Sequence, residues 1–380
     1  MSDNISLSPS QQTGILLVNL GTPDSTSVSD VRKYLLQFLM DWRVIDIPAI
    51  PRWILVNGII GPFRAPKSAK VYRSVWTPEG SPLMVYTQSF KAKLATALGP
   101  EYVVELGMRY QSPSTESALE KFKNKGFERI VVVPLFPQYA SASSGSVHDE
   151  VMRLVRNWQI VPEIVMLHQF FAHPGFLNAI TQVWADYFEA KLKVQLPVDQ
   201  YWSSQQLQKD EKGHDHGYQH VVFSYHGLPE RQIRKGDCSN GGCLSSTCCD
   251  TLRADNRSCY RAQCFATTRL LVAKLGIPEG SYTTCFQSRL GNDPWIKPYT
   301  DDKIKELAKS GVHRVLALSP SFVSDCLETI EEIGVEYKEK FEEAGGHVWD
   351  LMPCVNDHDS WVEGMASILR TYKPAHFLVG

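Results

Sequence analysis

The residue with the clearest chemical capacity is His226, in the run Ser224-Tyr-His-Gly-Leu-Pro, which follows a short apolar segment at 220–223. An imidazole, with a reference pKa of about 6.5, accepts or releases a proton near neutral pH. If the apolar segment is a buried strand, His226 stands at its carboxyl end, where α/β proteins bind ligands, and Gly227 lets the backbone pass close to one. The alternative is a satisfied histidine in a turn, and the residues alone do not separate the two.

Glutamates form a second candidate, because Glu328, Glu332 and Glu336 recur at every fourth position. On one helical face such like charges repel by about 0.2 to 0.5 kcal/mol per pair. The stripe therefore favours proton transfer or binding of a hard divalent cation. The alternative is a solvated face, since Asp325 and Glu328 have the N-cap and N3 spacing of a helix start.

Cysteines crowd into a short stretch, which holds five of the nine: Cys238, Cys243, Cys248, Cys249 and Cys259. The count of nine is odd and the polar amino terminus does not resemble an export signal, so a disulfide framework is not expected. Thiolates this dense in a reducing compartment favour a soft metal, either zinc or an iron–sulfur cluster.

The elements that must position these groups are short β-branched runs that alternate with longer amphipathic segments. Strands are predicted at 14–20, 102–107, 129–135, 160–167, 220–225, 282–286, 314–318 and 347–351. Helices are predicted at 115–125, 147–158, 175–192, 260–275 and 325–344. This alternation predicts an α/β protein with parallel sheets.

Two internal echoes lie about half a chain apart. Residues 126–134 resemble 311–320, and residues 17–23 resemble 223–229. Together with the length of 380 residues, they predict two similar doubly wound lobes that face a shared cleft.

The expected boundaries are an N-terminal lobe at 12–170 and a C-terminal lobe at 171–372. The second lobe carries the histidine and glutamate motifs and a cysteine-rich insert at 238–259. The first carries an apolar region at about 33–63, in which prolines prevent one clean membrane-spanning helix. This lip is expected either to rest on a membrane surface or to be buried core.

Composition sets the remaining bounds. A net charge of −2, with 43% hydrophobic and 21% charged residues, is typical of a soluble globular protein and argues against nucleic-acid binding. We expect a cytoplasmic protein, a monomer or homodimer, with peripheral contact of the lip at the inner face of the membrane as a further option.

Taken together, seven strings in order resemble the ferrochelatase family, over about residues 14–356. They are Gly14-Ile-Leu-Leu-Val-Asn-Leu-Gly-Thr-Pro, Glu79-Gly-Ser-Pro-Leu, Met108-Arg-Tyr, Phe136-Pro-Gln-Tyr-Ala-Ser, Ser224-Tyr-His-Gly-Leu-Pro, Gln287-Ser-Arg-Leu-Gly-Asn-Asp-Pro-Trp and Ser324-Asp-Cys-Leu-Glu-Thr. The resemblance implies a two-lobed lyase that inserts ferrous iron into a porphyrin, the final step of haem synthesis, without an organic cofactor.

The resemblance also implies roles for residues. His226 would take a pyrrole proton, Glu328 would be the acid opposite it, and both would meet the substrate iron, with Glu332 and Glu336 continuing an acidic path. Porphyrin-binding residues would be Arg109, Tyr110, Gln138, Tyr139, Ser141 and Trp295. The alternatives are that Arg109 only ties the lobes together and that Trp295 is plain core.

Two departures from the family pattern stand out. Cys326 replaces a histidine common two residues before the acid, and we expect it to be a neutral, packed thiol. The insert separates Gly236-Asp237 from Tyr260, which many members join directly. Some ferrochelatases carry a 2Fe-2S cluster in such an insert, so we expect four of its five cysteines to bind one, with zinc as the next choice.

The predicted reaction is insertion of ferrous iron into protoporphyrin IX to make protohaem. Open alternatives are a coproporphyrin ferrochelatase, a cobalt chelatase of the cobalamin path, and a non-catalytic haem- or metal-binding protein in which His226 is an axial ligand. Apolar Leu36, Leu39 and Ile47 mildly favour the greasier protoporphyrin.

Overall fold

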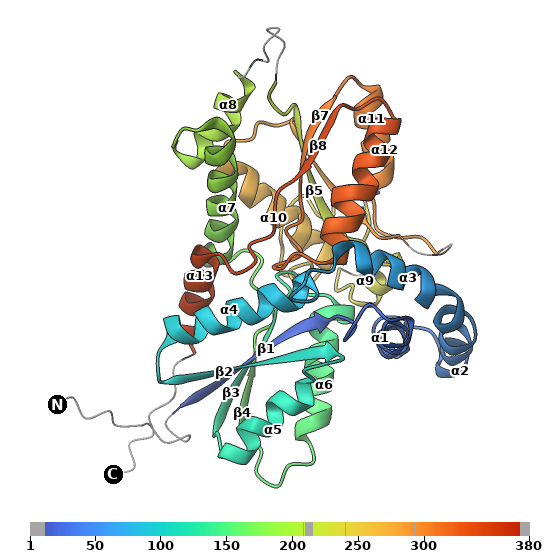
Figure 1. Cartoon of the computed structure of the whole chain (residues 1–380), viewed down its shortest axis with the longest axis vertical. Coiled ribbons are helices and arrows are strands. Elements are labelled where there is room, and N and C mark those ends of the chain that lie inside the picture. Colours follow the sequence, from blue (N-terminus) through green and yellow to red (C-terminus); the bar gives the residue numbers. More distant parts are fainter. Residues whose placement is uncertain are drawn as a thin grey trace, which may run out of the picture. The chain divides into compact units, whose positions relative to one another are not determined.

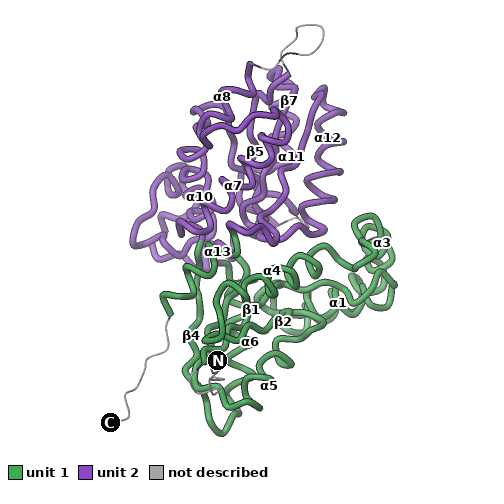
Figure 2. Tube along the Cα trace, turned by 60° about the vertical axis from the view of Figure 1, so that its left-hand side comes forward, with its two compact units in different colours: residues 1–136, 140–170, 361–380 green, residues 137–139, 171–360 purple. Residues whose placement is uncertain are grey.

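The computed structural model describes residues 12–207, 209, 216–239, 241–289, 291 and 293–372. The first eleven residues, on which the expectation about export rests, lie outside these ranges. The chain divides into two compact units (Figure 2). Unit 1 comprises residues 1–136, 140–170 and 361–380, and unit 2 comprises residues 137–139 and 171–360.

Unit 1 is built on a parallel sheet with strand order β2-β1-β3-β4 (Figure 1). Its strands are β1 (Thr13–Gly21), β2 (Tyr102–Tyr110), β3 (Arg129–Pro134) and β4 (Glu163–Met166). The central strands β1 and β3 are buried almost throughout, as expected of parallel strands covered on both faces.

Helices of unit 1 follow these strands in βα order. They are α1 (Val28–Met40), α2 (Ala49–Trp53), the π-helix η2 (Ile54–Ile60), α3 (Gly61–Val75), α4 (Pro82–Leu98), α5 (Thr115–Lys125), the π-helix η3 (Ser141–Gly145) and α6 (Ser146–Val155). Ser114 caps α5 by accepting a hydrogen bond from the Ser117 backbone, and Gly126 ends the helix with φ of 73°.

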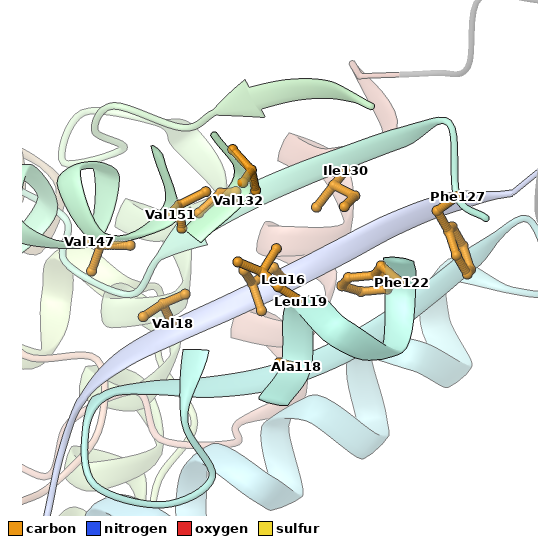
Figure 3. Close-up of a cluster of buried hydrophobic side chains, with 11 residues drawn as sticks. Leu16, Val18, Ala118, Leu119, Phe122, Phe127, Ile130, Val132, Val147 and Val151 are labelled. Carbon is orange, nitrogen blue, oxygen red and sulfur yellow. The ribbon is translucent and has the colours of Figure 1, made fainter. Parts of the chain in front are cut away.

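One core of unit 1 lies between β1 and β3 on one side and α5 and α6 on the other (Figure 3). Phe122 of α5 is buried and packs edge-on against Phe127, with ring centroids 5.1 Å apart. Val147 and Val151 of α6 are fully buried in the same cluster. This close packing holds β1 in a fixed position, and with it the start of the segment that follows the strand.

The last helix, α13 (Asp359–Arg370), falls within the expected second lobe at 171–372, but the chain from Trp361 onward groups with unit 1. Trp361 is fully buried, and its ring centroid lies 5.5 Å from those of both Phe90 and Phe170. These aromatic contacts explain why the chain from 361 onward belongs to unit 1. In the opposite sense, residues 137–139 belong to unit 2 although they fall within the expected first lobe.

Unit 2 is built on a second parallel sheet, with strand order β6-β5-β7-β8. Its strands are β5 (His220–His226), β6 (Tyr282–Gln287), β7 (Arg314–Leu318) and β8 (Val348–Leu351). The helices are α7 (Pro174–Leu192), the 3-10 turn η4 (Val198–Gln200), α8 (Tyr201–Gln206), α9 (Glu230–Lys235), α10 (Tyr260–Leu275), α11 (Thr300–Lys309), the π-helix η5 (Glu328–Glu336) and α12 (Tyr337–Glu343).

A core of unit 2 joins the sheet to α11, η5 and α12. Ile333 of η5 and Phe341 of α12 are fully buried against strand residues that include Val222 and Trp349. The Trp349 indole also donates to the Ile333 carbonyl at 2.8 Å. The acidic helix is therefore fixed to the sheet through its apolar face.

The two sheets share one topology, because the first strand of each unit lies second in its sheet and is flanked by the next two strands. The sequence echoes fall on equivalent strands, with 126–134 reaching β3 and 311–320 covering β7. The predicted α/β fold with two parallel-sheet lobes is confirmed, as are all eight predicted strands.

The single helix predicted at 325–344 is wrong in form, since a nine-residue π-helix precedes α12. A π-helix closes its hydrogen bonds over five residues and is rare, so helical spacing alone does not predict it.

The large apolar side chains of the lip predicted at about 33–63 are exposed mainly in its later part. Leu35 and Leu39 of α1 are buried, whereas Ile50 and Phe63 are 75% and 77% exposed. None of the helices in the described residues is long and apolar enough to cross a membrane.

Candidate active site

His226 closes β5, as the sequence predicts, and its imidazole is held in one tautomer. The ring Nδ1 lies 2.7 Å from the Gly227 carbonyl oxygen. A carbonyl only accepts, so Nδ1 carries the hydrogen and Nε2 keeps a lone pair. Nε2 is therefore the atom of this ring that can take up a proton or bind a metal.

Neighbouring elements fix the backbone of His226. The Tyr260 hydroxyl, at the start of α10, donates to the His226 carbonyl at 2.8 Å. The His226 N–H donates to Ser321 Oγ at 3.3 Å. The histidine is thus tied both to α10 and to the segment after β7.

Gly227 permits a close approach of other protein atoms to its backbone. A Cβ at this position would lie 2.6 Å from the Gln287 carbonyl oxygen and 3.1 Å from the Trp295 ring. Trp295 also forms a β-bridge with Pro229, so its indole belongs to the wall beside the histidine loop. Any larger residue at 227 would displace that wall.

Gln287, at the end of β6, connects the histidine strand with the acidic helix. It lies opposite His226 in the strand register. Its Oε1 accepts from Ser224 Oγ at 2.7 Å, and its Nε2 donates to the Glu328 carbonyl at 3.2 Å. The histidine and Glu328 motifs are therefore brought to the same end of the unit 2 sheet.

The three glutamates of η5 have different surroundings. The Glu332 carboxylate accepts hydrogen bonds from Gln287, Ser288 and Tyr337. Glu336 is paired with Lys340 Nζ at 2.6 Å, and its side chain is half exposed. The predicted stripe is present, but its members are not equivalent.

Cys326 is buried two residues before Glu328. Burial raises the pKa of its thiol well above the usual value, and the charge of Glu328 adds to the shift. The thiol is therefore protonated at neutral pH. This agrees with the expected neutral, packed cysteine.

In unit 1, Arg109 and Tyr110 converge on Asp41, which follows α1. Asp41 Oδ2 accepts from Arg109 Nη2 at 2.7 Å, from the Tyr110 hydroxyl at 2.9 Å and from Ser146 Oγ at 2.5 Å. Arg109 Nε is also used, donating to Ser146 Oγ at 2.7 Å. The guanidinium thus holds a buried protein carboxylate.

Ser141 joins the same group through Arg43, whose backbone N–H donates to Asp41 Oδ1 at 2.8 Å and whose Nη1 donates to Ser141 Oγ at 3.1 Å. Asp41 is a residue that sequence reasoning missed. It had no signal, since a single acid after an amphipathic helix is common.

Gln138 and Tyr139, also predicted to bind porphyrin, group with unit 2. Gln138 is buried and donates to Thr267 Oγ1 at 3.1 Å and to the Pro320 carbonyl at 3.3 Å. The Tyr139 N–H donates to Gln263 Oε1 at 2.7 Å. Both are anchored to α10, while Gln138 Oε1 is buried without a partner among the described residues.

Four of the five insert thiols lie near one another. The Sγ atoms of Cys248 and Cys249 are 3.5 Å apart. A hydrogen bond between Cys249 and Cys259 lowers the pKa of the Cys259 thiol and raises the pKa of the Cys249 thiol. Burial, with neighbouring Cys259, Asp237 and Cys248 adding to it, raises the pKa of Cys243 to about 11.

The fifth thiol, Cys238, is exposed and faces the Gly236 carbonyl at 3.7 Å. Within the described residues, no group of three or more His, Cys, Asp or Glu side chains is arranged to hold a metal ion.

Comparison with known proteins shows the family of the chain. The model of the ferrochelatase family matches residues 12–373. Ferrochelatase from Legionella pneumophila (strain Lens) is 42% identical over 94% of this chain and 98% of that protein. Ferrochelatase from Coxiella burnetii (strain Dugway 5J108-111) is 39% identical over 94% of this chain and 93% of that protein.

A solved structure of SirB from Bacillus subtilis with Fe3+ aligns over 95% of this chain and 96% of that chain. Its TM-score of 0.49 and sequence identity of 14% are too low to bear on function.

With a histidine and a glutamate motif at the strand ends of an α/β unit, the matches over nearly the whole chain define a porphyrin metal chelatase, which is a lyase. The chain belongs to the ferrochelatase family. It inserts ferrous iron into a porphyrin in haem synthesis.

Proposed function

We propose that the porphyrin is protoporphyrin IX and the product protohaem. The support is the apolar character of the segment around α2, η2 and α3, where Ile50, Trp53, Ile54, Ile59 and Phe63 are all more than half exposed. Protoporphyrin has apolar vinyl groups where coproporphyrin has further propionates. An exposed apolar segment of this kind favours contact with the vinyl groups of protoporphyrin.

In this reaction His226 takes a pyrrole proton through Nε2. A planar macrocycle admits a metal only when its two inner N–H protons leave, so a base must stand at one face of the ring. The Nδ1 bond to Gly227 supports this role, because it leaves Nε2 unprotonated and aims the ring. Trp295 lies beside this loop and offers a flat surface to the macrocycle.

Glu328 is the acid that meets the substrate iron, with Glu332 and Glu336 beyond it along η5. Its support is the connection to the histidine strand through Gln287. Carboxylate oxygens are suitable ligands for a divalent cation that is about to be released to a porphyrin.

The remaining porphyrin-binding residues fall into two groups. Arg109, Tyr110 and Ser141 lie around the Asp41 segment of unit 1, and Arg109 acts through Asp41 more than through a propionate. Gln138 and Tyr139 shape the wall next to α10.

Four insert cysteines, Cys243, Cys248, Cys249 and Cys259, hold a 2Fe-2S cluster. Their donor chemistry fits, because thiolates are the ligands of such clusters and Arg261 Nη1 lies 3.0 Å from Cys249 Sγ, where it stabilises negative charge. Their present arrangement does not by itself meet a metal's geometry. The cluster takes no part in the proton and metal steps above.

The exposed lip, residues 50–63, rests on the inner face of the cytoplasmic membrane. Its large apolar side chains are exposed, and exposed Arg64, Lys67 and Lys70 follow it. Apolar insertion beside basic residues suits an anionic lipid surface.

The catalytic assignment predicts that Glu328→Gln abolishes iron insertion while porphyrin still binds. The amide keeps the shape but removes the charge that meets the iron. Anaerobic insertion is followed by absorbance, and porphyrin binding by tryptophan fluorescence. Glu339→Gln, an exposed charge change on α12, is the matched control and should retain turnover. Unchanged turnover in Glu328→Gln would refute the assignment.

The substrate assignment predicts a higher kcat/KM for protoporphyrin IX than for coproporphyrin. Purified enzyme is assayed anaerobically with ferrous iron and each porphyrin, in the same detergent to remove differences in solubility. An equal or inverted preference contradicts the choice of protoporphyrin.

The cluster assignment predicts 2Fe-2S absorption and, after reduction, an electron paramagnetic resonance signal in anaerobically purified protein. Cys249→Ser should remove both, because it deletes one of four ligands. Cys238→Ser should keep both, since the exposed thiol lies outside the group. Protein that contains zinc and no iron would count against a cluster, and loss of the signal in Cys238→Ser would reject this set of ligands.

The membrane assignment predicts that the protein co-sediments with vesicles containing anionic lipid. Replacing Ile50 and Phe63 with Asp should weaken binding at least about tenfold, because each removes a large exposed apolar side chain. Ile160→Asp is the control, since this residue of unit 1 is 84% exposed outside the lip. Equal vesicle binding by the lip variant and the control would exclude the lip as the contact.

A further inference from the structure

The carboxylate of Glu332 is saturated with hydrogen-bond donors. Oε1 accepts from the Ser288 N–H at 2.8 Å and the Tyr337 hydroxyl at 3.0 Å. Oε2 accepts from Ser288 Oγ at 2.5 Å and Gln287 Nε2 at 3.3 Å. An ionised carboxylate offers about four lone-pair positions, and all of them are used here.

This arrangement depends on an unusual backbone at Ser288, which has φ of 66°. A serine rarely adopts this left-handed conformation, because its Cβ approaches the following carbonyl. At Ser288 the conformation allows both the N–H and the hydroxyl to reach one carboxylate. The backbone strain is thus associated with holding Glu332, as is common at functional sites.

The Tyr337 hydroxyl is also held as a donor. Tyr337 is buried at the first position of α12, and burial, with the charge of Glu332 next, raises the pKa of its hydroxyl far above the usual value. The hydroxyl therefore remains protonated and donates. Two of the other three donors are N–H groups, which cannot accept.

Neither neighbouring glutamate of the stripe is held in this way. Glu328 lies two residues from the buried Cys326, and Glu336 forms a half-exposed ion pair with Lys340. A station in a proton path must be able to donate as well as accept. Glu332 could do so only after losing one of its four donors.

We propose that Glu332 acts as a fixed negative charge that favours ferrous iron at Glu328, and that Ser288 and Tyr337 are the positioning residues that hold it. The proposal rests on the assignment of Glu328 to the substrate iron. It removes Glu332 from the proton-carrying path and gives it an electrostatic role one helical turn away. The charge of Glu332 therefore affects the affinity for ferrous iron, whereas His226 and Glu328 determine the rate of the proton steps.

The test separates iron KM from kcat in Glu332→Gln, Tyr337→Phe and Ser288→Ala, with porphyrin saturating. Loss of the charge in Glu332→Gln should raise the KM for ferrous iron about tenfold, because a nearby unit charge is removed from a partly buried site. Tyr337→Phe and Ser288→Ala should raise it less. In all three, kcat should stay within about twofold of wild type and its solvent deuterium isotope effect should not change.

Ser288→Gly separates the hydroxyl from the strained backbone, because glycine adopts this φ freely. It should behave as Ser288→Ala does. Glu339→Gln, an exposed charge change on α12, should leave the iron KM unchanged. Porphyrin binding and melting temperature are measured for each variant to confirm that it is folded.

The outcomes distinguish this proposal from the catalytic assignment. A fall in kcat with unchanged iron KM, or a changed isotope effect on kcat, in Glu332→Gln would make Glu332 a proton carrier and overturn the proposal. Should Glu332→Gln not fold, an unchanged iron KM in both Tyr337→Phe and Ser288→Ala would overturn it equally. Full turnover in Glu328→Gln would instead refute the iron-binding assignment on which it rests.

Discussion

The side chain of Gln287 imposes the constraint on which the unit 2 site depends. Its oxygen is committed to Ser224 on the histidine strand, and its nitrogen to the Glu328 carbonyl and the Glu332 carboxylate on η5. One amide therefore fixes the register of the acidic π-helix against β5. Since Gln287 and Ser224 are buried, a side chain at 287 that could not both donate and accept would leave polar groups unpaired.

A π-helix is consistent with that constraint. The apolar face of η5 must place Ile333 in the core, where its carbonyl meets the Trp349 indole, while the same segment presents Glu328 and Glu332 to the end of β6. The segment thus has to satisfy the sheet on one side and Gln287 and Ser288 on the other. As a π-helix the segment loses the regular α-helical hydrogen-bond pattern but keeps both sets of contacts.

The sequence predicted what depends on local pattern. The eight strands were readable because buried parallel strands are short apolar runs, and His226 lies at the carboxyl end of one, as predicted. Contacts between distant segments were not readable. Asp41 as the partner of Arg109, and Trp361 as a core residue of unit 1, depend on which surfaces meet, and no local spacing records that. Gln287 and Ser288 belong to the motif at 287–295. Their contacts with Glu332, however, depend on the positive φ of Ser288 and on distances that a sequence does not give.

The insert meets the site at a defined point, which limits how it can affect the chemistry. Cys259 is the N-cap residue of α10, and the next residue, Tyr260, donates to the His226 carbonyl. Arg261 follows, contacting Cys249 on one side and the Lys297 carbonyl on the other. An inserted loop at this position has to preserve the start of α10, because a shift there would move the backbone that aims the imidazole. The cysteines of residues 238–259 therefore lead directly into the helix start whose tyrosine holds the His226 backbone.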